Sequence, residues 1–244
     1  MAKLSIIIPA YNEQATLEKI VEKVIKVNLA NHFDKEIIIV NDSSKDKTLE
    51  IATKLSLKYK QIQVINNQTN LGKSQTVKKG IMNSTGDFVV IQDADLEYNP
   101  EEINFLLEQL IKNKCDVAYG NRFGMFNGVI YTQNFVGNLL LSFVSSIFTT
   151  VRLRVVIPDM EVCYKMMLGN IAREIAPKLT ATSNFGFEPE ITARLSKYIK
   201  DGKHLKFIVL PISYNPRSVE DGKKMSAFKD GFKALLEILK YNLF

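Results

Sequence analysis

Three acidic residues alternate directly after an apolar run, and this spacing is the most informative chemical signal in the chain. The run Phe88–Ile91 is typical of a buried strand, and Asp93, Asp95 and Glu97 follow it. Side chains two residues apart on an extended segment point the same way, so we expect three carboxylates in one place. A hard divalent cation such as Mg²⁺ would relieve their mutual repulsion, because it prefers oxygen ligands and shares them with phosphate. The alternative is a solvated acidic loop before a helix that starts near Pro100.

The elements that would position these acids alternate regularly through the first half of the chain. We expect strands at 4–8, 36–41, 62–66, 88–92 and 116–120, with helices at 13–27, 48–59, 73–83 and 100–112 between them. Near-continuous apolar strands separated by helices predict an α/β fold with a Rossmann-like, mostly parallel sheet covered on both faces. Ligands of such sheets lie outside the carboxyl ends of the strands. Further on, we expect a helix at 189–198, a strand at 204–214 and an amphipathic helix at 227–241.

Composition narrows the class of function. The 244 residues carry a net charge of +6, which suits anionic lipid or phosphorylated small molecules. Nucleic acid is not expected as a partner, because no dense Lys/Arg cluster with interleaved aromatic residues occurs. The first strand is not followed by the glycine pattern of dinucleotide-binding proteins, and the chain has no P-loop. Cys115 and Cys163 show no metal-type spacing and are expected to be core residues, and without a signal peptide we expect a cytoplasmic protein.

A long segment without charge interrupts the second half. No charged residue occurs between Arg122 and Arg152, and residues 135–151 are mainly apolar but contain several Ser, Thr and Asn side chains. A membrane-spanning helix needs about 20 mainly apolar residues, which this segment does not reach. A core helix and a helix lying on a membrane surface are both compatible with it, and Arg152 and Arg154 favour the surface.

Several segments together resemble the inverting, GT-A-fold glycosyltransferases of family 2, and within that family the dolichol-phosphate mannose and polyprenyl-phosphate glucose synthases. The resemblance covers nearly the whole chain, and it rests on the order and spacing of residues 7–13, 39–46, 70–73, 92–97, 119–123, 159–165, 187–191, 211–217 and 222–224. It implies a single catalytic domain over 1–244, with a nucleotide-sugar-binding half at 1–118 and an acceptor-binding half at 119–244.

The resemblance implies a nucleotide-sugar donor, of the GDP-mannose or UDP-glucose type, held with Mg²⁺ or Mn²⁺. The metal ligands would be Asp93, Asp95 and Glu97, where the family often has glutamine in the third position. Donor-binding residues would be Pro9, Ala10, Tyr11, Glu13, Asp42, Lys73, Asp93 and Ala94. Three of these have plainer interpretations: Glu13 as an acid in a first helical turn, Asp42 as a helix cap, and Lys73 as a solvated cation.

The resemblance also implies a polyprenyl phosphate acceptor. Its phosphate would attack the sugar in line, with Asp95, Asp159, Arg122, Arg217 and Lys223 as catalytic residues, and Lys224 as a less certain cation. Asp159 matches the family's base and Glu190 is the second candidate, although a dianionic phosphate hardly needs one. Ordinary surface charge is the alternative for Arg122 and Arg217, and an exposed acid near a helix start for Glu190.

The same resemblance implies interfacial amphipathic helices and peripheral association with the cytoplasmic face of a membrane, where a separate membrane protein subunit could join the enzyme. Other functions remain open at this stage. They are a family 2 enzyme acting on a sugar hydroxyl in surface polysaccharide synthesis, a non-catalytic sugar-nucleotide-binding protein and a nucleotidyltransferase. The last is disfavoured because no Gly-rich basic loop follows the first strand.

Overall fold

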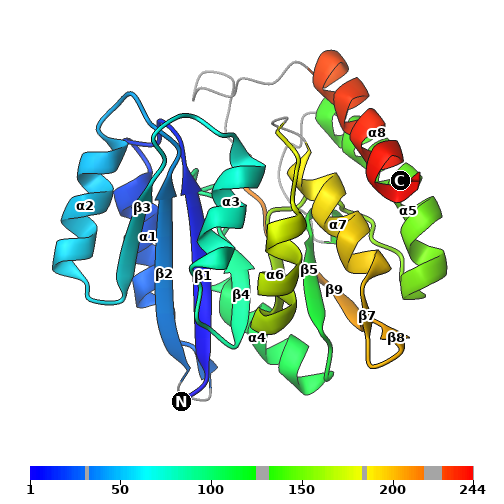
Figure 1. Cartoon of the computed structure of the whole chain (residues 1–244), viewed down its shortest axis with the longest axis horizontal. Helices are drawn as coiled ribbons and strands as arrows, with labels where there is room; N and C mark the ends of the chain where they lie inside the picture. The colour runs from blue at the N-terminus through cyan, green and yellow to red at the C-terminus, as the bar shows by residue number, and fades with distance from the viewer. Residues whose placement is uncertain (31–32, 125–131, 183–185, 217–226, 244) are drawn as a thin grey trace.

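A seven-stranded sheet forms the centre of the molecule (Figure 1). The structure is a computed structural model, which describes the chain except residues 31–32, 125–131, 183–185, 217–226 and 244. The strand order is β3-β2-β1-β4-β6-β5-β9. The bounds are β1 Lys3–Ala10, β2 Asp34–Asn41, β3 Ile62–Asn66, β4 Phe88–Ile91, β5 Val117–Asn121, β6 Lys165–Leu168 and β9 Phe207–Pro211.

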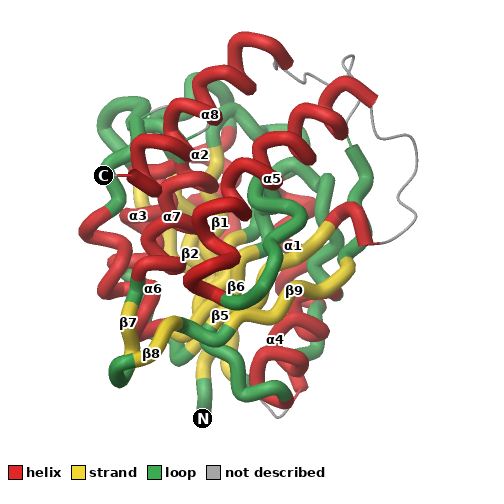
Figure 2. Tube along the Cα trace, turned by 90° about the vertical axis from the view of Figure 1, so that its right-hand side faces the viewer, coloured by secondary structure: helices red, strands yellow, loops and turns green. Residues whose placement is uncertain are grey.

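The pairing confirms the expected mostly parallel α/β architecture. β1 pairs in parallel with β2 and β4, β2 with β3, and β5 with β9. Ile6, Ile7 and Ile8 of β1 are fully buried, as required for a strand covered on both faces. Figures 1 and 2 place α3 (Lys73–Met82), α6 (Gly169–Ile175) and α7 (Phe187–Lys197) on one face, and α1 (Leu17–Lys26) and α4 (Glu102–Lys112) on the other. A further helix, α2 (Thr48–Lys58), packs beside β3.

Two features of the second half differ from expectation. β6 was not expected, and it pairs antiparallel with both β4 and β5. It begins with Lys165, a fully buried charged residue that hides the strand pattern in the sequence. The strand expected at 204–214 is confirmed only over β9, because His204 belongs to β8 (Lys203–His204), which forms a separate hairpin with β7 (Ile199–Lys200).

Two long helices lie beside the far edge of the sheet. α5 (Thr132–Leu153) includes the mainly apolar residues 135–151 of the charge-free segment, and α8 (Ala227–Leu243) is the expected C-terminal helix. The two helices contact each other and α7, and Figure 2 shows them together on one side of the molecule. Within the described ranges, none of the helices combines the length and the apolar character that crossing a bilayer requires.

Candidate donor and metal site

A pocket of about 440 Å³, here called the donor pocket, opens at the carboxyl ends of β1, β2 and β4. Parallel strands bring their carboxyl ends to one edge, which explains why segments far apart in sequence meet there. The lining residues are Pro9, Ala10, Tyr11, Glu13, Asp42, Asn70, Gly72, Lys73, Thr76, Asp93, Ala94 and Asp95. The pocket therefore gathers all the residues expected to bind the donor, whereas Asn70, Gly72 and Thr76 were missed. Binding itself stays a prediction.

Asp42 holds the loop that forms one wall of the donor pocket. Its two carboxylate oxygens accept hydrogen bonds from the backbone N–H groups of Leu71 and Gly72, both at 2.9 Å, and one also accepts from the Asn67 amide at 2.8 Å. Gly72 has φ +81°, which glycine adopts without strain. The helix-cap interpretation of Asp42 is wrong, since α2 begins six residues later and Asp46 bonds to its first N–H. Asp42 thus orders the loop in front of Lys73.

Lys73 stands between two carboxylates from different parts of the chain. Its Nζ lies 3.1 Å from an Asp93 oxygen and 2.8 Å from Oε1 of Glu188 on α7. Burial lowers the pKa of Lys73, but the charges of Asp93 and Glu188 outweigh it and raise that pKa well above its ordinary value. The interpretation of Lys73 as a solvated cation is therefore wrong. A fixed ammonium group at this place can meet phosphate.

The three alternating acids do not lie on an extended segment. β4 ends at Ile91, the following residues turn, and Leu96 has φ +66°. Asp93 and Asp95 line the donor pocket, whereas Glu97 accepts a 2.7 Å hydrogen bond from the Tyr214 hydroxyl. Among the described residues, no group of three or more His, Cys, Asp and Glu side chains is placed to hold a metal ion. The expectation of three converging carboxylates, argued from strand geometry, was wrong.

Two carboxylates still fit a divalent cation. Mg²⁺ is commonly bound by one or two carboxylates together with the phosphates of a substrate. Asp93 and Asp95 supply hard oxygen donors on the pocket wall, close to the Lys73 ammonium group. The donor set therefore suits a metal ion that arrives with a diphosphate. The role of Glu97 as a third ligand stays a prediction.

Arg122 and Asp159 form a buried ion pair next to this site. The Arg122 guanidinium donates to both Asp159 oxygens, at 2.8 and 2.7 Å, and the Arg122 backbone N–H donates at 2.9 Å. Asp159 is fully buried, and the guanidinium carbon lies 5.0 Å from the ring centre of Tyr214. The surface-charge interpretation of Arg122 is therefore wrong. Because Asp159 already accepts three hydrogen bonds, its geometry suits holding Arg122 in place.

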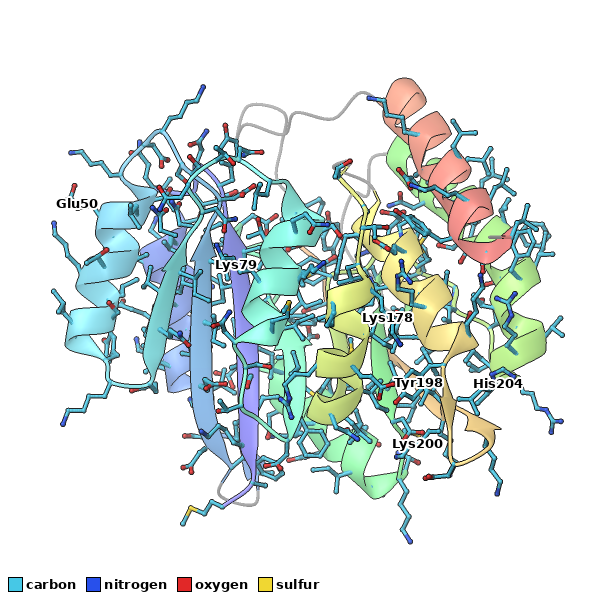
Figure 3. All side chains as sticks on the ribbon, in the orientation of Figure 1. Glu50, Lys79, Lys178, Tyr198, Lys200 and His204 are labelled. Carbon is cyan, nitrogen blue, oxygen red and sulfur yellow. The ribbon has the colours of Figure 1, made fainter. Side chains whose placement is uncertain are left out.

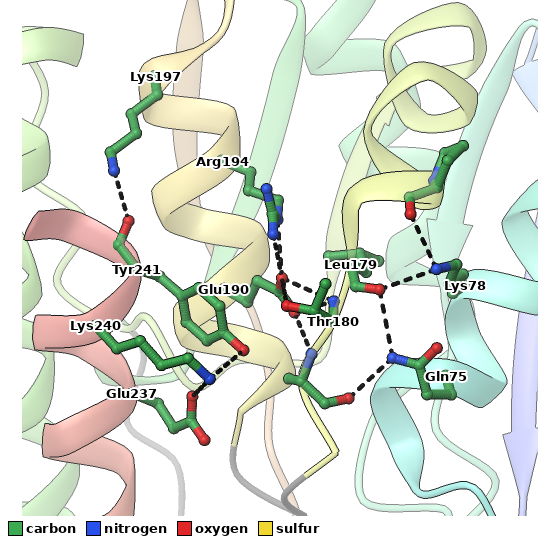
Figure 4. Close-up of polar contacts among 12 residues, drawn as sticks. Gln75, Lys78, Leu179, Thr180, Glu190, Arg194, Lys197, Glu237, Lys240 and Tyr241 are labelled. Carbon is green, nitrogen blue, oxygen red and sulfur yellow. Dashed lines mark hydrogen bonds and ion pairs between the residues drawn. The ribbon is translucent and has the colours of Figure 1, made fainter. Parts of the chain in front are cut away.

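Other expected residues have different outcomes. Arg217, Lys223 and Lys224 lie outside the described residues. Glu190 is fully buried, and its carboxylate accepts hydrogen bonds from Thr180, Ala181 and Arg194 (Figure 4). The interpretation of Glu190 as an exposed acid was wrong. Glu190 holds the segment before α7 in place. The helix α7 carries Glu188, which forms an ion pair with Lys73.

Glu161 and Lys165 were not singled out, although both lie within the segment 159–165 that carried the resemblance. Glu161 Oε1 is buried without a hydrogen-bond partner. Burial and then the Glu188 charge raise the pKa of Glu161 to about 8, against the nearby charges of Lys165, Arg122 and Lys73. Burial lowers the pKa of Lys165, whose ammonium group donates to the Val162 carbonyl. The sequence did offer one signal for Glu161, namely that it is a second acidic residue two positions after Asp159.

Known proteins match this chain in sequence and in fold. A sequence model of the family described as "Glycosyl transferase family 2" matches residues 5–170. The dolichol-phosphate mannosyltransferase of Pyrococcus furiosus is 40% identical over 121 residues, covering 50% of this chain and 33% of that protein. The dolichyl-phosphate beta-glucosyltransferase of Dictyostelium discoideum is 27% identical over 248 residues, covering 97% of this chain and 73% of that protein. The chain thus spans about a third of the mannosyltransferase's length.

The structural likeness is to a GT-A enzyme of low sequence identity. A crystal structure of glucosyl-3-phosphoglycerate synthase from Mycobacterium tuberculosis, with Mn²⁺, UDP and phosphoglyceric acid, aligns with a TM-score of 0.68 at 16% identity. The alignment covers 98% of this chain and 78% of that one. At this identity the likeness supports the fold alone. With the family match over two thirds of its residues, the chain belongs to glycosyl transferase family 2 and has the GT-A fold.

Proposed function

We propose that this protein transfers a hexose from a nucleotide sugar to a polyprenyl or dolichyl phosphate. The observation that carries the proposal is the donor pocket, where Lys73, Asp93 and Asp95 converge at the carboxyl ends of the strands. This combination of one cation and two carboxylates suits a diphosphate with a divalent metal ion. The names of the dolichyl-phosphate sugar transferases among its relatives support the choice of acceptor.

The donor would lie across the pocket with its diphosphate near Asp95. Tyr11 is 43% exposed, so its ring is free to pack against the nucleoside, and Glu13 and Asp42 lie beside it. Mg²⁺ or Mn²⁺ held by Asp93 and Asp95 would neutralise charge on the departing nucleotide. Lys73 adds a fixed positive charge to the same place, and Asp42 holds the loop before Lys73 in position.

The acceptor phosphate would approach from the side of Arg122. Arginine suits this task because its planar guanidinium binds phosphate oxygens in pairs. Asp159 fixes the orientation of Arg122, and we assign it this positioning role in preference to proton removal. A phosphate monoester has a second pKa of about 6 and is mostly dianionic at neutral pH, so its oxygen can attack the anomeric carbon without a base. Arg217 and Lys223 are proposed as further cations for the acceptor.

The lipid tail requires an apolar surface, and α5 offers one. Leu139, Phe143, Ile147 and Val151 recur every four residues, which places them on one face of the helix. Their exposed fractions range from 47% to 83%, which is unusual for contiguous large apolar side chains. We propose that this face, here called the α5 stripe, rests on the cytoplasmic face of a membrane as a peripheral contact.

One experiment tests the proposed function. The protein is incubated with GDP-mannose, UDP-glucose and other nucleotide sugars, a short polyprenyl phosphate and Mg²⁺ or Mn²⁺, and the products are identified by mass. We expect one hexose added to the lipid phosphate by the wild-type protein and none by Asp95→Asn. Transfer to a sugar hydroxyl, or release of free sugar with every lipid phosphate, would contradict the assigned acceptor.

A further inference from the structure

A second pocket, of about 690 Å³ and here called the basic pocket, lies where the end of α5 meets the β7–β8 hairpin. Its cationic or titratable lining residues are Arg152, Arg154, Lys203, His204 and Lys206. It adjoins Phe207, where β9 starts, so it lies at the opposite end of the sheet from the donor pocket. Figure 3 shows His204 beside the lower end of α5, far from the carboxyl ends of β1 and β2.

The positive charge of this pocket is not compensated by its lining. No acidic side chain lines the part of it that the structure describes. The Arg152 guanidinium donates to neutral groups, the Ser196 hydroxyl and two oxygens of Asn242, at 3.3 to 3.5 Å. Lys206 Nζ contacts the Asn113 carbonyl at 3.5 Å. A concave surface with four formal charges of one sign attracts anions strongly.

Arg154, directly after α5, and Lys203, on β8, bring two cations to this pocket from different segments. Both are exposed, and across the described ranges neither side chain has a hydrogen bond or ion pair. Two acidic residues lie nearby, but neither pairs with these cations. Asp116 pairs with Lys200 at 2.6 Å, and Asp201 lies in the exposed hairpin turn. These two cations therefore remain available to a ligand.

The backbone is well defined where α5 ends, and positive charge predominates around it. Arg154 has φ +56°, and its N–H donates to the Thr150 carbonyl at 2.8 Å, which is the left-handed cap that commonly ends a helix and here fixes the backbone of Arg154. Burial and then the positive charges of Arg152 and Arg194 lower the pKa of Lys197 behind the pocket, as expected where cations outnumber anions.

Apolar side chains beside the basic pocket indicate the source of the anion. Val151, at the end of the α5 stripe, is 83% exposed, Val156 is 58% exposed, and Ile199 on the pocket wall is 52% exposed. Figure 2 shows the hairpin on the same side of the molecule as α5 and α8. A soluble phosphate needs only the cations, whereas a phospholipid offers a phosphate and acyl chains together.

We propose that the basic pocket binds the phosphate of an anionic membrane phospholipid and so anchors the end of α5 on the bilayer. This second lipid contact is separate from the acceptor site, because Arg122 and the donor pocket lie at the other end of the strands. It rests on the proposed peripheral association of the α5 stripe, and it adds a charge requirement to that association. The pocket would set the orientation of the protein on the membrane.

Sedimentation with vesicles tests the proposal. The double variant R154Q/K203Q removes two charges from the pocket, and the matched control K19Q/K60Q removes two from exposed positions on α1 and after α2. Each Lys or Arg near an anionic surface contributes about 1 kcal/mol, so we expect R154Q/K203Q to bind phosphatidylglycerol-containing vesicles about tenfold to thirtyfold more weakly than wild type. The control should bind nearly as the wild type does. Equal binding by the two double variants would overturn the proposal.

Two further measurements separate the possible outcomes. Thermal stabilisation by inorganic phosphate that depends on Arg154 and Lys203, without any preference for anionic over phosphatidylcholine vesicles, would assign the pocket to a soluble phosphate and overturn the lipid assignment. Turnover of a short, water-soluble polyprenyl phosphate without vesicles should be the same in R154Q/K203Q and wild type. Loss of that turnover in the variant would overturn a purely anchoring role, whereas absence of turnover in the wild type would contradict the proposed function instead.

Discussion

The Tyr214 hydroxyl donates a 2.7 Å hydrogen bond to Glu97, and the ring of the same tyrosine lies 5.0 Å from the Arg122 guanidinium carbon. Burial and then the Glu97 charge raise the pKa of Tyr214, so the hydroxyl remains a donor at neutral pH. One side chain thus connects the acidic turn after β4 with the proposed acceptor cation. This contact joins residues 117 positions apart and could not be predicted from either motif alone.

Replacing Tyr214 by phenylalanine tests this connection. Y214F keeps the ring beside Arg122 but removes the donor to Glu97, so the acidic turn should loosen. We expect weaker Mn²⁺ binding in the presence of nucleoside diphosphate, by about threefold to tenfold, since the net contribution of one hydrogen bond is about 0.5 to 1.5 kcal/mol. Titration calorimetry measures the effect, with Y198F as the control for loss of an exposed tyrosine hydroxyl. Unchanged affinity would show that the contact does not order the site.

Asn in place of Asp42 tests the loop that forms one wall of the donor pocket. D42N leaves one of the Leu71 and Gly72 N–H groups facing an amide nitrogen, which costs about 1 to 3 kcal/mol for an unsatisfied buried group. We expect faster hydrogen exchange at Leu71 and Gly72 and weaker nucleotide binding. D201N, at an exposed hairpin position, is the control and should change neither. Intact exchange protection at both amides in D42N would contradict the role of Asp42.

The Arg122–Asp159 pair predicts a large effect on stability. D159N keeps the shape of the side chain but leaves the Arg122 guanidinium without its counter-charge in a buried place. Breaking such a pair costs about 3 to 5 kcal/mol, which the urea midpoint of unfolding would reveal. E50Q removes an exposed pair with Lys54 on α2 and should change the midpoint little. Similar midpoints for D159N and wild type would mean that water or other groups compensate for the charge.

Glu161 predicts how stability depends on pH. Its folded pKa of about 8 lies above the ordinary value of 4.5, so the native state binds more protons than the unfolded state between these values. The stabilisation from neutral Glu161 is complete below pH 4.5 and is lost as pH rises towards and through 8. E161Q stays neutral, so its advantage in unfolding free energy over the wild type should grow to about 4 kcal/mol by that pH.

Urea unfolding across the pH range measures this difference. The exposed substitution E18Q serves as the control and should run parallel to the wild type. A constant gap between E161Q and wild type at all pH values would mean that folding does not raise the pKa of Glu161.

The parallel part of the fold was predictable because each of its strands is a short apolar run that shows its burial in the local sequence. The Ile6–Ile8 run and its equivalents in β2 and β4 are apolar on both faces, which a strand covered by helices requires. β6 was not predictable, because Lys165 at its start reads as polar. Its burial depends on the Val162 carbonyl and on the Tyr119 ring, 5.1 Å away, and no local pattern shows either.

The composition of the donor pocket followed from strand ends, but its geometry did not. Parallel pairing explains why Tyr11, Asp42 and Asp93 meet. The positive φ of Leu96 breaks the alternation that was expected to direct Glu97 towards the pocket. The partners of the cations were also hidden, since Lys73 meets Glu188 across 115 residues. Ion pairs between distant segments depend on packing, which a single sequence does not encode in local spacing.

The most direct measurement is the binding of nucleoside diphosphate with and without Mn²⁺ by titration calorimetry, in wild type and D95N. We predict that Mn²⁺ tightens binding of GDP or UDP by tenfold or more in the wild type, since a shared metal ion neutralises the diphosphate against Asp93 and Asp95. D95N should lose most of this gain while retaining weak, metal-independent binding through Lys73 and the pocket wall. Equal tightening by Mn²⁺ in D95N and wild type would mean that Asp95 does not hold a metal ion together with the diphosphate.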